Sequence, residues 1–121
     1  MNPDCHILVV EDDPDTRRAM RIVLEGEGYR VDGAANGQEA LDFLRQDGKP
    51  CVILLDLMMP VMDGWRFREE QSQDPNLAEI PVVVVSADGN VPQKASALGA
   101  AGYIQKPAEI DLLLQAFGEH C

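Results

Sequence analysis

Short apolar runs alternate with longer amphipathic segments along the whole chain, and this alternation is typical of βα units arranged around a parallel sheet. Three of the runs are almost continuous Val, Ile and Leu, as strands buried on both faces require. The predicted strands span residues 5–10, 29–31, 51–55, 82–85 and 102–104. The pattern therefore predicts an α/β fold with a doubly wound, five-stranded parallel sheet.

Five helices are expected to connect and follow these strands. Asp13 can cap the first, with Pro14 at its first position, and helical spacing of apolar residues continues to Gly26. Asn36, with Glu39 three residues later, resembles a capping box that starts the second. The other three helices are expected to begin near residue 63, to span residues 91–98 and to carry the apolar stripe of residues 110–117.

Polar side chains occur where the predicted strands end. For right-handed βα units with helices on two faces, the strand order 2-1-3-4-5 places strands one and three side by side. Ligands of open α/β sheets bind at the carboxyl ends of the strands, where the strand order reverses. We therefore expect one site that gathers five side chains: Glu11, Asp12, Asp56, Ser86 and Lys106.

Three of these side chains are carboxylates, and two like charges 4 Å apart repel by about 4 kcal/mol at an effective dielectric of 20. A cation must therefore compensate. Oxygen ligands without a nearby His or Cys cluster favour a hard ion, and an incomplete shell suits Mg²⁺ better than Ca²⁺, with Mn²⁺ as a substitute. His6 and His120 have no acidic or cysteine partner at ligand spacing and are interpreted as structural or exposed.

A carboxylate held beside such an ion can attack phosphorus and form an aspartyl phosphate. Asp56 is the expected nucleophile and needs no general base, because an aspartate is ionised at neutral pH. Lys106 is long enough to reach the phosphoryl oxygens from the more distant strand five, and the Ser86 hydroxyl can donate one hydrogen bond to them. These three residues are the candidate phosphoryl-transfer residues.

Composition narrows the possible functions. A chain of 121 residues fits one domain, residues 1–121, and its net charge of −11 makes direct nucleic-acid binding unfavourable. Three cysteines without a C-x-x-C pair fit reduced thiols. The start of the chain does not resemble a signal peptide, and no apolar stretch could span a bilayer. A cytoplasmic location without membrane contact is expected.

Four groups of motifs, in order and at matching spacing, resemble the receiver domain of response regulators in two-component signalling. They are ILVVEDD at 7–13; LLDLMMP at 54–60 with MDG at 62–64; VVSA at 84–87; and GA at 99–100, continuing through Tyr103 to Lys106-Pro107. Each motif alone is weak, but together they are highly specific and cover the full length.

The resemblance implies a role for each matching position. Asp56 becomes the phosphoacceptor, Glu11 and Asp12 the acidic pair, and the backbone carbonyl of Met58 a further metal ligand. A switch pair is implied as well, in which a hydroxyl engages the phosphoryl group and an aromatic ring then turns inward. The matching residues are Ser86, where the family more often has Thr, and Tyr103.

The resemblance also implies a phosphorylation-dependent switch that is not an enzyme with its own substrate. Its donor would be a histidine kinase or a His-phosphotransfer protein, and its target an unknown downstream protein. The expected state is a monomer or a phosphorylation-dependent dimer, and no output domain is expected within these residues. Two alternatives are a pseudo-receiver that only binds and an aspartyl-phosphate phosphatase, which would need an acid at Met58.

Overall fold

A computed structural model describes residues 6–46, 50–57, 61–87, 90–105, 111–112 and 114–115. Within these ranges the chain forms strands and helices in alternation. The strands are β1 (His6–Val10), β2 (Arg30–Ala34), β3 (Val52–Asp56), β4 (Val82–Ser86) and β5 (Gly102–Gln105). The helices are α1 (Pro14–Gly26), α2 (Gly37–Gln46), α3 (Gly64–Gln73) and α4 (Val91–Leu98).

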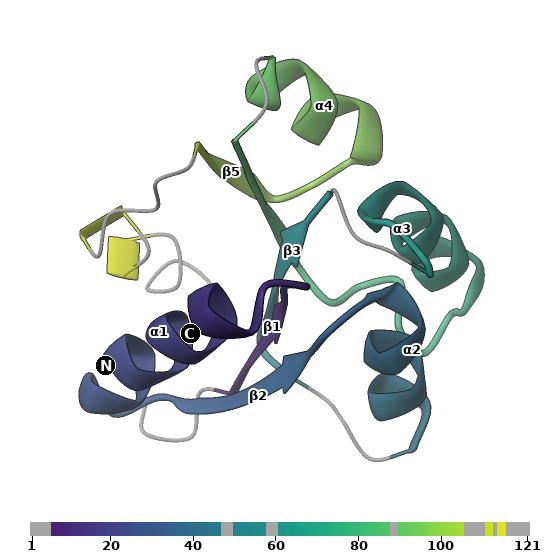
Figure 1. Cartoon of the computed structure of the whole chain (residues 1–121). Coiled ribbons are helices and arrows are strands. Elements are labelled where there is room, and N and C mark those ends of the chain that lie inside the picture. The colour runs from purple at the N-terminus through teal and green to yellow at the C-terminus, as the bar shows by residue number, and fades with distance from the viewer. Residues whose placement is uncertain are drawn as a thin grey trace.

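All five strands are parallel and lie in the order β2-β1-β3-β4-β5, which confirms the predicted sheet (Figure 1). The described residues form four helices rather than the five predicted. The predicted fifth helix, 110–117, lies largely outside the described residues. Of that segment, residues 111, 112, 114 and 115 are helical.

The second strand is longer than its sequence predicts. It continues from Arg30 to Ala34, although Asp32 and Gly33 have poor strand propensity. All five of its residues pair with β1, so the ladder of β1 compensates for the unfavourable local sequence. The longer strand brings the end of β2 level with the end of β1.

Two apolar clusters cover the two faces of the sheet. One joins Leu8, Val10 and their neighbours on other strands to residues of α2, α3 and α4. The other joins Ile7, Val9 and their neighbours to Met20 of α1 and to other residues on that face. Figure 1 shows α1 on one side of the sheet and α2 with α3 on the other. The strands are therefore buried from both faces, as their apolar sequences predicted.

The predicted helix starts are confirmed at side-chain level. The Asp13 carboxylate accepts from the backbone N–H of Asp15 at 3.1 Å and from the Thr16 hydroxyl at 2.7 Å. Asn36 accepts from the N–H of Glu39 at 2.9 Å. These caps satisfy N–H groups that have no partner inside the helix, so they fix where α1 and α2 begin.

Polar contacts tie α3 to its neighbours. The Arg68 guanidinium donates to the carbonyls of Leu98 at 2.9 Å and Gly99 at 3.2 Å, and to the side chain of Gln71 at 3.0 Å. Burial lowers the pKa of Arg68 from its ordinary value. The fully buried Gln71 amide in turn donates to the carbonyl of Leu77 at 2.9 Å. Arg68 thereby fixes the end of α4 against α3.

No helix in the described ranges combines the length and apolar character that crossing a bilayer requires.

Gly64 is expected to be intolerant of any side chain. A Cβ at this position would lie 2.8 Å from the backbone oxygen of Asp56 and 2.8 Å from the Cα of Leu57. Backbone atoms of a buried strand end cannot move aside cheaply, so Gly64→Ala should lower the free energy of unfolding by about 1–3 kcal/mol. Urea denaturation of the two proteins measures this difference.

Gly26→Ala is the matched control, because a Cβ at Gly26 meets nothing within 4 Å. Alanine has the higher helix propensity, so this variant should be neutral or slightly stabilising. Equal midpoints for Gly64→Ala and wild type would show that the close approach at Gly64 is relieved without cost.

Candidate functional site

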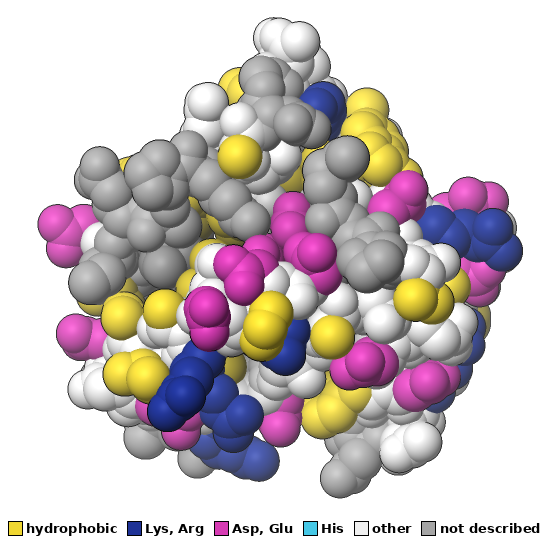
Figure 2. Space-filling view, in the orientation of Figure 1, with side chains coloured by type: hydrophobic (Ala, Val, Ile, Leu, Met, Phe, Trp, Pro, Cys, Tyr) yellow, Lys and Arg dark blue, Asp and Glu magenta, His cyan; other side chains and the backbone are white. Residues whose placement is uncertain are grey.

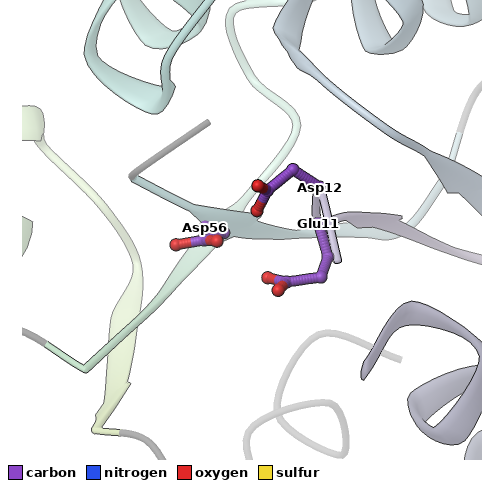
Figure 3. Close-up of side chains that lie close together, drawn as sticks. All are labelled: Glu11, Asp12 and Asp56. Atoms are coloured by element: carbon purple, nitrogen blue, oxygen red, sulfur yellow. The ribbon is translucent and has the colours of Figure 1, made fainter. Parts of the chain in front are cut away.

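Three carboxylates converge at the carboxyl edge of the sheet. One oxygen atom from each of Glu11, Asp12 and Asp56 lies within 4.8 Å of the other two. Figure 3 shows the three side chains pointing into a shared space, two from the segment after β1 and one from β3. The convergence predicted from the strand order is therefore present.

Backbone hydrogen bonds hold the segment after β1 in place. The Glu11 N–H donates to the carbonyl of Ala34 at 3.0 Å, which continues the pairing with β2 beyond the end of β1. The Glu11 carbonyl accepts from Nη1 of Arg17 at 2.7 Å. Glu11 is buried, whereas Asp12 is exposed. The acidic pair thus has one member inside the protein and one facing solvent.

Asp56 is the last residue of β3 rather than the residue after it, one residue beyond the predicted strand end. It pairs with Val85 of β4, and the preceding Leu55 pairs with Val10 of β1. Only 6% of Asp56 is exposed, so this carboxylate is positioned by the central strands of the sheet and not by a surface loop. Such a position gives the side chain little freedom to move.

The segment after Asp56 is held at two points. The N–H of Gly64 donates to the carbonyl of Leu57 at 3.0 Å, and the N–H of Gly37 donates to the carbonyl of Met62 at 3.0 Å. Between them, Val61 has a φ of 66° and is exposed, an unfavourable conformation for a β-branched residue. The predicted ligand Met58 lies outside the described residues.

Ser86 ends β4 and is buried, at the same edge of the sheet. Because Asp56 pairs with Val85, Ser86 is one residue further along than the residue directly beside Asp56. Ser86 itself pairs with Gln105, the last residue of β5. Lys106 follows Gln105 directly but lies outside the described residues, so its predicted place in the site stays a prediction.

Tyr103, the other member of the predicted switch pair, is on β5 opposite Val84. Its side chain is 52% exposed. The residue therefore faces solvent in this structure, two residues before the Ser86 level of the sheet.

The donor set of the cluster fits a hard divalent cation. All three side chains offer carboxylate oxygens, which Mg²⁺ and Mn²⁺ accept, and the cluster includes no softer nitrogen or sulfur ligand. Acidic side chains gather near the middle of the face shown in Figure 2. Because Asp12 is exposed, water molecules could complete the shell, as Mg²⁺ sites generally require.

Comparison with known proteins places the chain in a family. Residues 7–118 match the response regulator receiver domain, and the chain belongs to this family of two-component signalling domains. It is 38% identical over 115 residues to the Bacillus subtilis uncharacterized transcriptional regulatory protein YkoG. That alignment covers 90% of this chain and 47% of YkoG, so the chain spans about half the length of that relative.

Shorter relatives and solved structures match over most of their own length. Protein PilH of Pseudomonas aeruginosa is 32% identical over 90% of this chain and 91% of PilH. The structure of chemotaxis protein CheY4 of Vibrio cholerae has a TM-score of 0.88 and 28% identity, covering 98% of this chain and 99% of CheY4. Receiver domains bind Mg²⁺ in an acidic pocket, and the cluster at Glu11, Asp12 and Asp56 has that character.

Some contacts around the site carry no signal in the sequence. The hydrogen bond from Arg17 to the Glu11 carbonyl depends on the direction in which α1 leaves β1. The hydrogen bond from the Gly37 N–H to the Met62 carbonyl joins residues 25 positions apart in the sequence. The pairing of His6 with Asp32 at 2.6 Å was also missed, because the partner comes from the neighbouring strand. The register places Arg30 directly opposite His6, so the contact with Asp32 is a diagonal one between the two strands.

The three carboxylates should repel one another when no cation is present. Asp12→Asn removes one charge from the exposed side of the cluster and should raise the free energy of unfolding in EDTA by about 1 kcal/mol. Urea denaturation in EDTA measures the gain. The control is Glu69→Gln, which removes the same charge from an exposed position on α3. A gain in Glu69→Gln as large as in Asp12→Asn would assign the effect to net charge alone.

Proposed function

We propose that the protein is a phosphorylation-dependent signalling switch that accepts a phosphoryl group on Asp56. One observation carries the proposal: the buried Asp56 carboxylate lies at the end of a central strand with an oxygen within 4.8 Å of oxygens of Glu11 and Asp12. Family membership supports it independently.

The proposed reaction transfers a phosphoryl group from the imidazole of a phosphohistidine to the carboxylate of Asp56. A carboxylate oxygen of Asp56 attacks phosphorus, the P–N bond of a phosphohistidine breaks, and the imidazole nitrogen keeps the bonding electron pair. The product is an acyl phosphate on Asp56. The step depends chiefly on positioning and on neutralising phosphoryl charge, and the strand-end placement of Asp56 supplies the first of these.

Glu11, Asp12 and Asp56 would hold Mg²⁺, together with the backbone carbonyl of Met58, and Mn²⁺ would substitute. The ion would supply positive charge to the phosphoryl oxygens. Glu11 would contribute its ligand oxygen from the buried side of the site, and Asp12 would contribute its ligand oxygen from the exposed side. Asp56 would serve both as ligand and as phosphoacceptor.

Two further side chains complete the proposed site. The Ser86 hydroxyl, at the end of β4, would donate to a phosphoryl oxygen, and Lys106, directly after β5, would neutralise another. Tyr103 would move inward behind Ser86, which changes the exposed surface of β5. Phosphorylation would thus shift an existing equilibrium between two conformations.

The proposed donor is a histidine kinase or a His-phosphotransfer protein in the cytoplasm, because the relatives are response regulators. The downstream partner is proposed to be a protein. Nucleic acid is disfavoured as a direct partner by the net charge of −11. We propose a monomer or a dimer that forms on phosphorylation.

Both alternatives differ from this proposal in stoichiometry. A pseudo-receiver would take up no phosphate from acetyl phosphate and Mg²⁺, whereas an aspartyl-phosphate phosphatase would release many equivalents per chain. The position two residues after Asp56 is Met58, which cannot act as the second acid of such a phosphatase. A switch takes up at most one equivalent.

Asp56→Asn should abolish phosphate incorporation, because the amide is a poor nucleophile toward phosphorus. Wild type incubated with labelled acetyl phosphate and Mg²⁺ should gain a hydroxylamine-labile label, and the variant none. Asp63→Asn is the control, since Asp63 caps α3 and lies outside the acidic cluster. Labelling of Asp56→Asn to the wild-type level would place the acceptor elsewhere.

Ser86→Ala should slow phosphorylation by roughly 10- to 100-fold, because it removes one hydrogen-bond donor to the developing charge. Ser86→Thr keeps the hydroxyl and should restore most of the rate. Stopped-flow measurement of the phosphorylation rate at saturating Mg²⁺ separates the two variants. If Ser86→Ala and Ser86→Thr were equally slow, packing at this buried position would explain the loss rather than the hydroxyl.

A further inference from the structure

A cavity lies between α1 and the edge strand β2, apart from the acidic cluster. It has a volume of about 310 Å³. None of the three clustered acids lines it. The described residues that line it come from β1, α1 and β2, and they are Val9, Pro14, Arg17, Arg18, Arg21, Val31 and Gly33.

Charge in this cavity has the opposite sign to the rest of the protein. The chain has 21 acidic and 10 basic residues. Every charged lining residue in the described ranges is nevertheless an arginine, and the three arginines lie on one face of α1, at positions 17, 18 and 21. Figure 2 shows basic side chains gathered below the acidic cluster, over α1 and β2. The cavity therefore favours an anion over a neutral or cationic ligand.

Within the described part of the chain, the three guanidiniums use only a few of their hydrogen-bond donors. Arg17 donates through Nη1 to the carbonyl of Glu11 at 2.7 Å, and Arg21 donates through Nε to Glu25 at 2.8 Å. Arg18 has no hydrogen bond or ion pair to any residue in the described ranges. A guanidinium has five N–H donors in a planar fork, so several remain for a ligand.

The interior of the cavity is apolar. Val9 and Val31 are buried strand residues that line it, together with Pro14. The aliphatic part of Arg17 packs over Gly33, where a Cβ would lie 3.1 Å from Cδ of Arg17, so it adds further apolar surface. A ligand that fills this space must therefore combine a charged group with a small apolar part.

We propose that this cavity binds a small phosphate monoester with a short apolar body. A carboxylate is satisfied by one bidentate arginine, whereas a phosphate has three acceptor oxygens and up to two charges, which match several arginines that line one cavity. The apolar body lies over Val9 and Val31. The site does not depend on the proposed phosphoacceptor role of Asp56.

The test is a titration of the whole chain with phenyl phosphate, in EDTA and at physiological salt. ¹H–¹⁵N NMR spectra recorded at each phenyl phosphate concentration measure the binding. Without a cation the acidic cluster repels anions, so binding there does not contribute. We expect saturable shifts at the amides of Val31 and Gly33 and at Nε–H of Arg17. Inorganic phosphate should bind about tenfold more weakly, because it lacks the apolar body, and benzyl alcohol should give no saturable shift.

Arg18→Gln is the diagnostic variant, because loss of Arg18 breaks no hydrogen bond or ion pair within the described residues. It should weaken phenyl phosphate binding about tenfold, the expected effect of one charge-assisted hydrogen bond. Arg30→Gln is the matched control. It removes the same charge from an exposed arginine of β2 that does not line the cavity, and should change the Kd by less than about twofold.

Three results would overturn the proposal. The first is a set of shifts that stay linear in phenyl phosphate concentration. The second is equal affinity for inorganic phosphate and phenyl phosphate, which would mean that charge alone attracts the probe. The third is an equal effect of Arg18→Gln and Arg30→Gln. Unchanged amide spectra of both free variants confirm that each is folded before the comparison is made.

Discussion

The buried sheet holds three negatively charged side chains, Glu11, Asp12 and Asp56, close together against their mutual repulsion. Two unit charges 4.8 Å apart repel by roughly 3.5 kcal/mol at an effective dielectric of 20. Full burial of one core side chain contributes about 1.5–3 kcal/mol. Val10 and Leu55, which precede the acids on β1 and β3, are each at most 1% exposed. A few such residues outweigh the repulsion, so the fold brings the carboxylates together.

The backbone around the site limits how these acids can move apart. Glu11 is fixed through its N–H by Ala34 and through its carbonyl by Arg17. On the other side, a Cβ on Gly64 would lie 2.8 Å from the Asp56 carbonyl oxygen, so the absence of a side chain allows the start of α3 to lie this close to the end of β3. The left-handed conformation of Val61 costs about 1–3 kcal/mol. The hydrogen bond from the Gly37 N–H to the carbonyl of the next residue, Met62, helps to hold it.

Much of the fold could be predicted from the sequence, because alternation and capping are local signals. The strand order followed from the handedness of βα units. Asp32 and Gly33 were missed as strand residues, since only pairing with β1 makes them extended. The fifth helix lies largely outside the described residues.

The candidate site divides in the same way. Convergence of Glu11, Asp12 and Asp56 followed from strand order alone and is confirmed. The cavity at Arg18 was not predicted, because it exists only where α1 packs beside β2. Ser86 lies at the expected edge of the sheet, whereas Met58 and Lys106 lie outside the described residues and stay predictions. Contacts between distant segments need the tertiary structure.

Two regions of opposite charge therefore adjoin near the start of α1, because Arg17, which lines the cavity, donates a hydrogen bond to the backbone carbonyl of Glu11 in the acidic cluster. The proposed function depends on the acidic region, because it requires these carboxylates to bind a divalent cation beside the residue that becomes phosphorylated.

Anomalous diffraction from crystals grown with Mn²⁺ tests that requirement most directly. We expect one strong peak among Glu11, Asp12 and Asp56, with oxygens of Asp12 and Asp56 at about 2.1–2.2 Å from the ion. A peak elsewhere, or none at saturating Mn²⁺, would contradict the account.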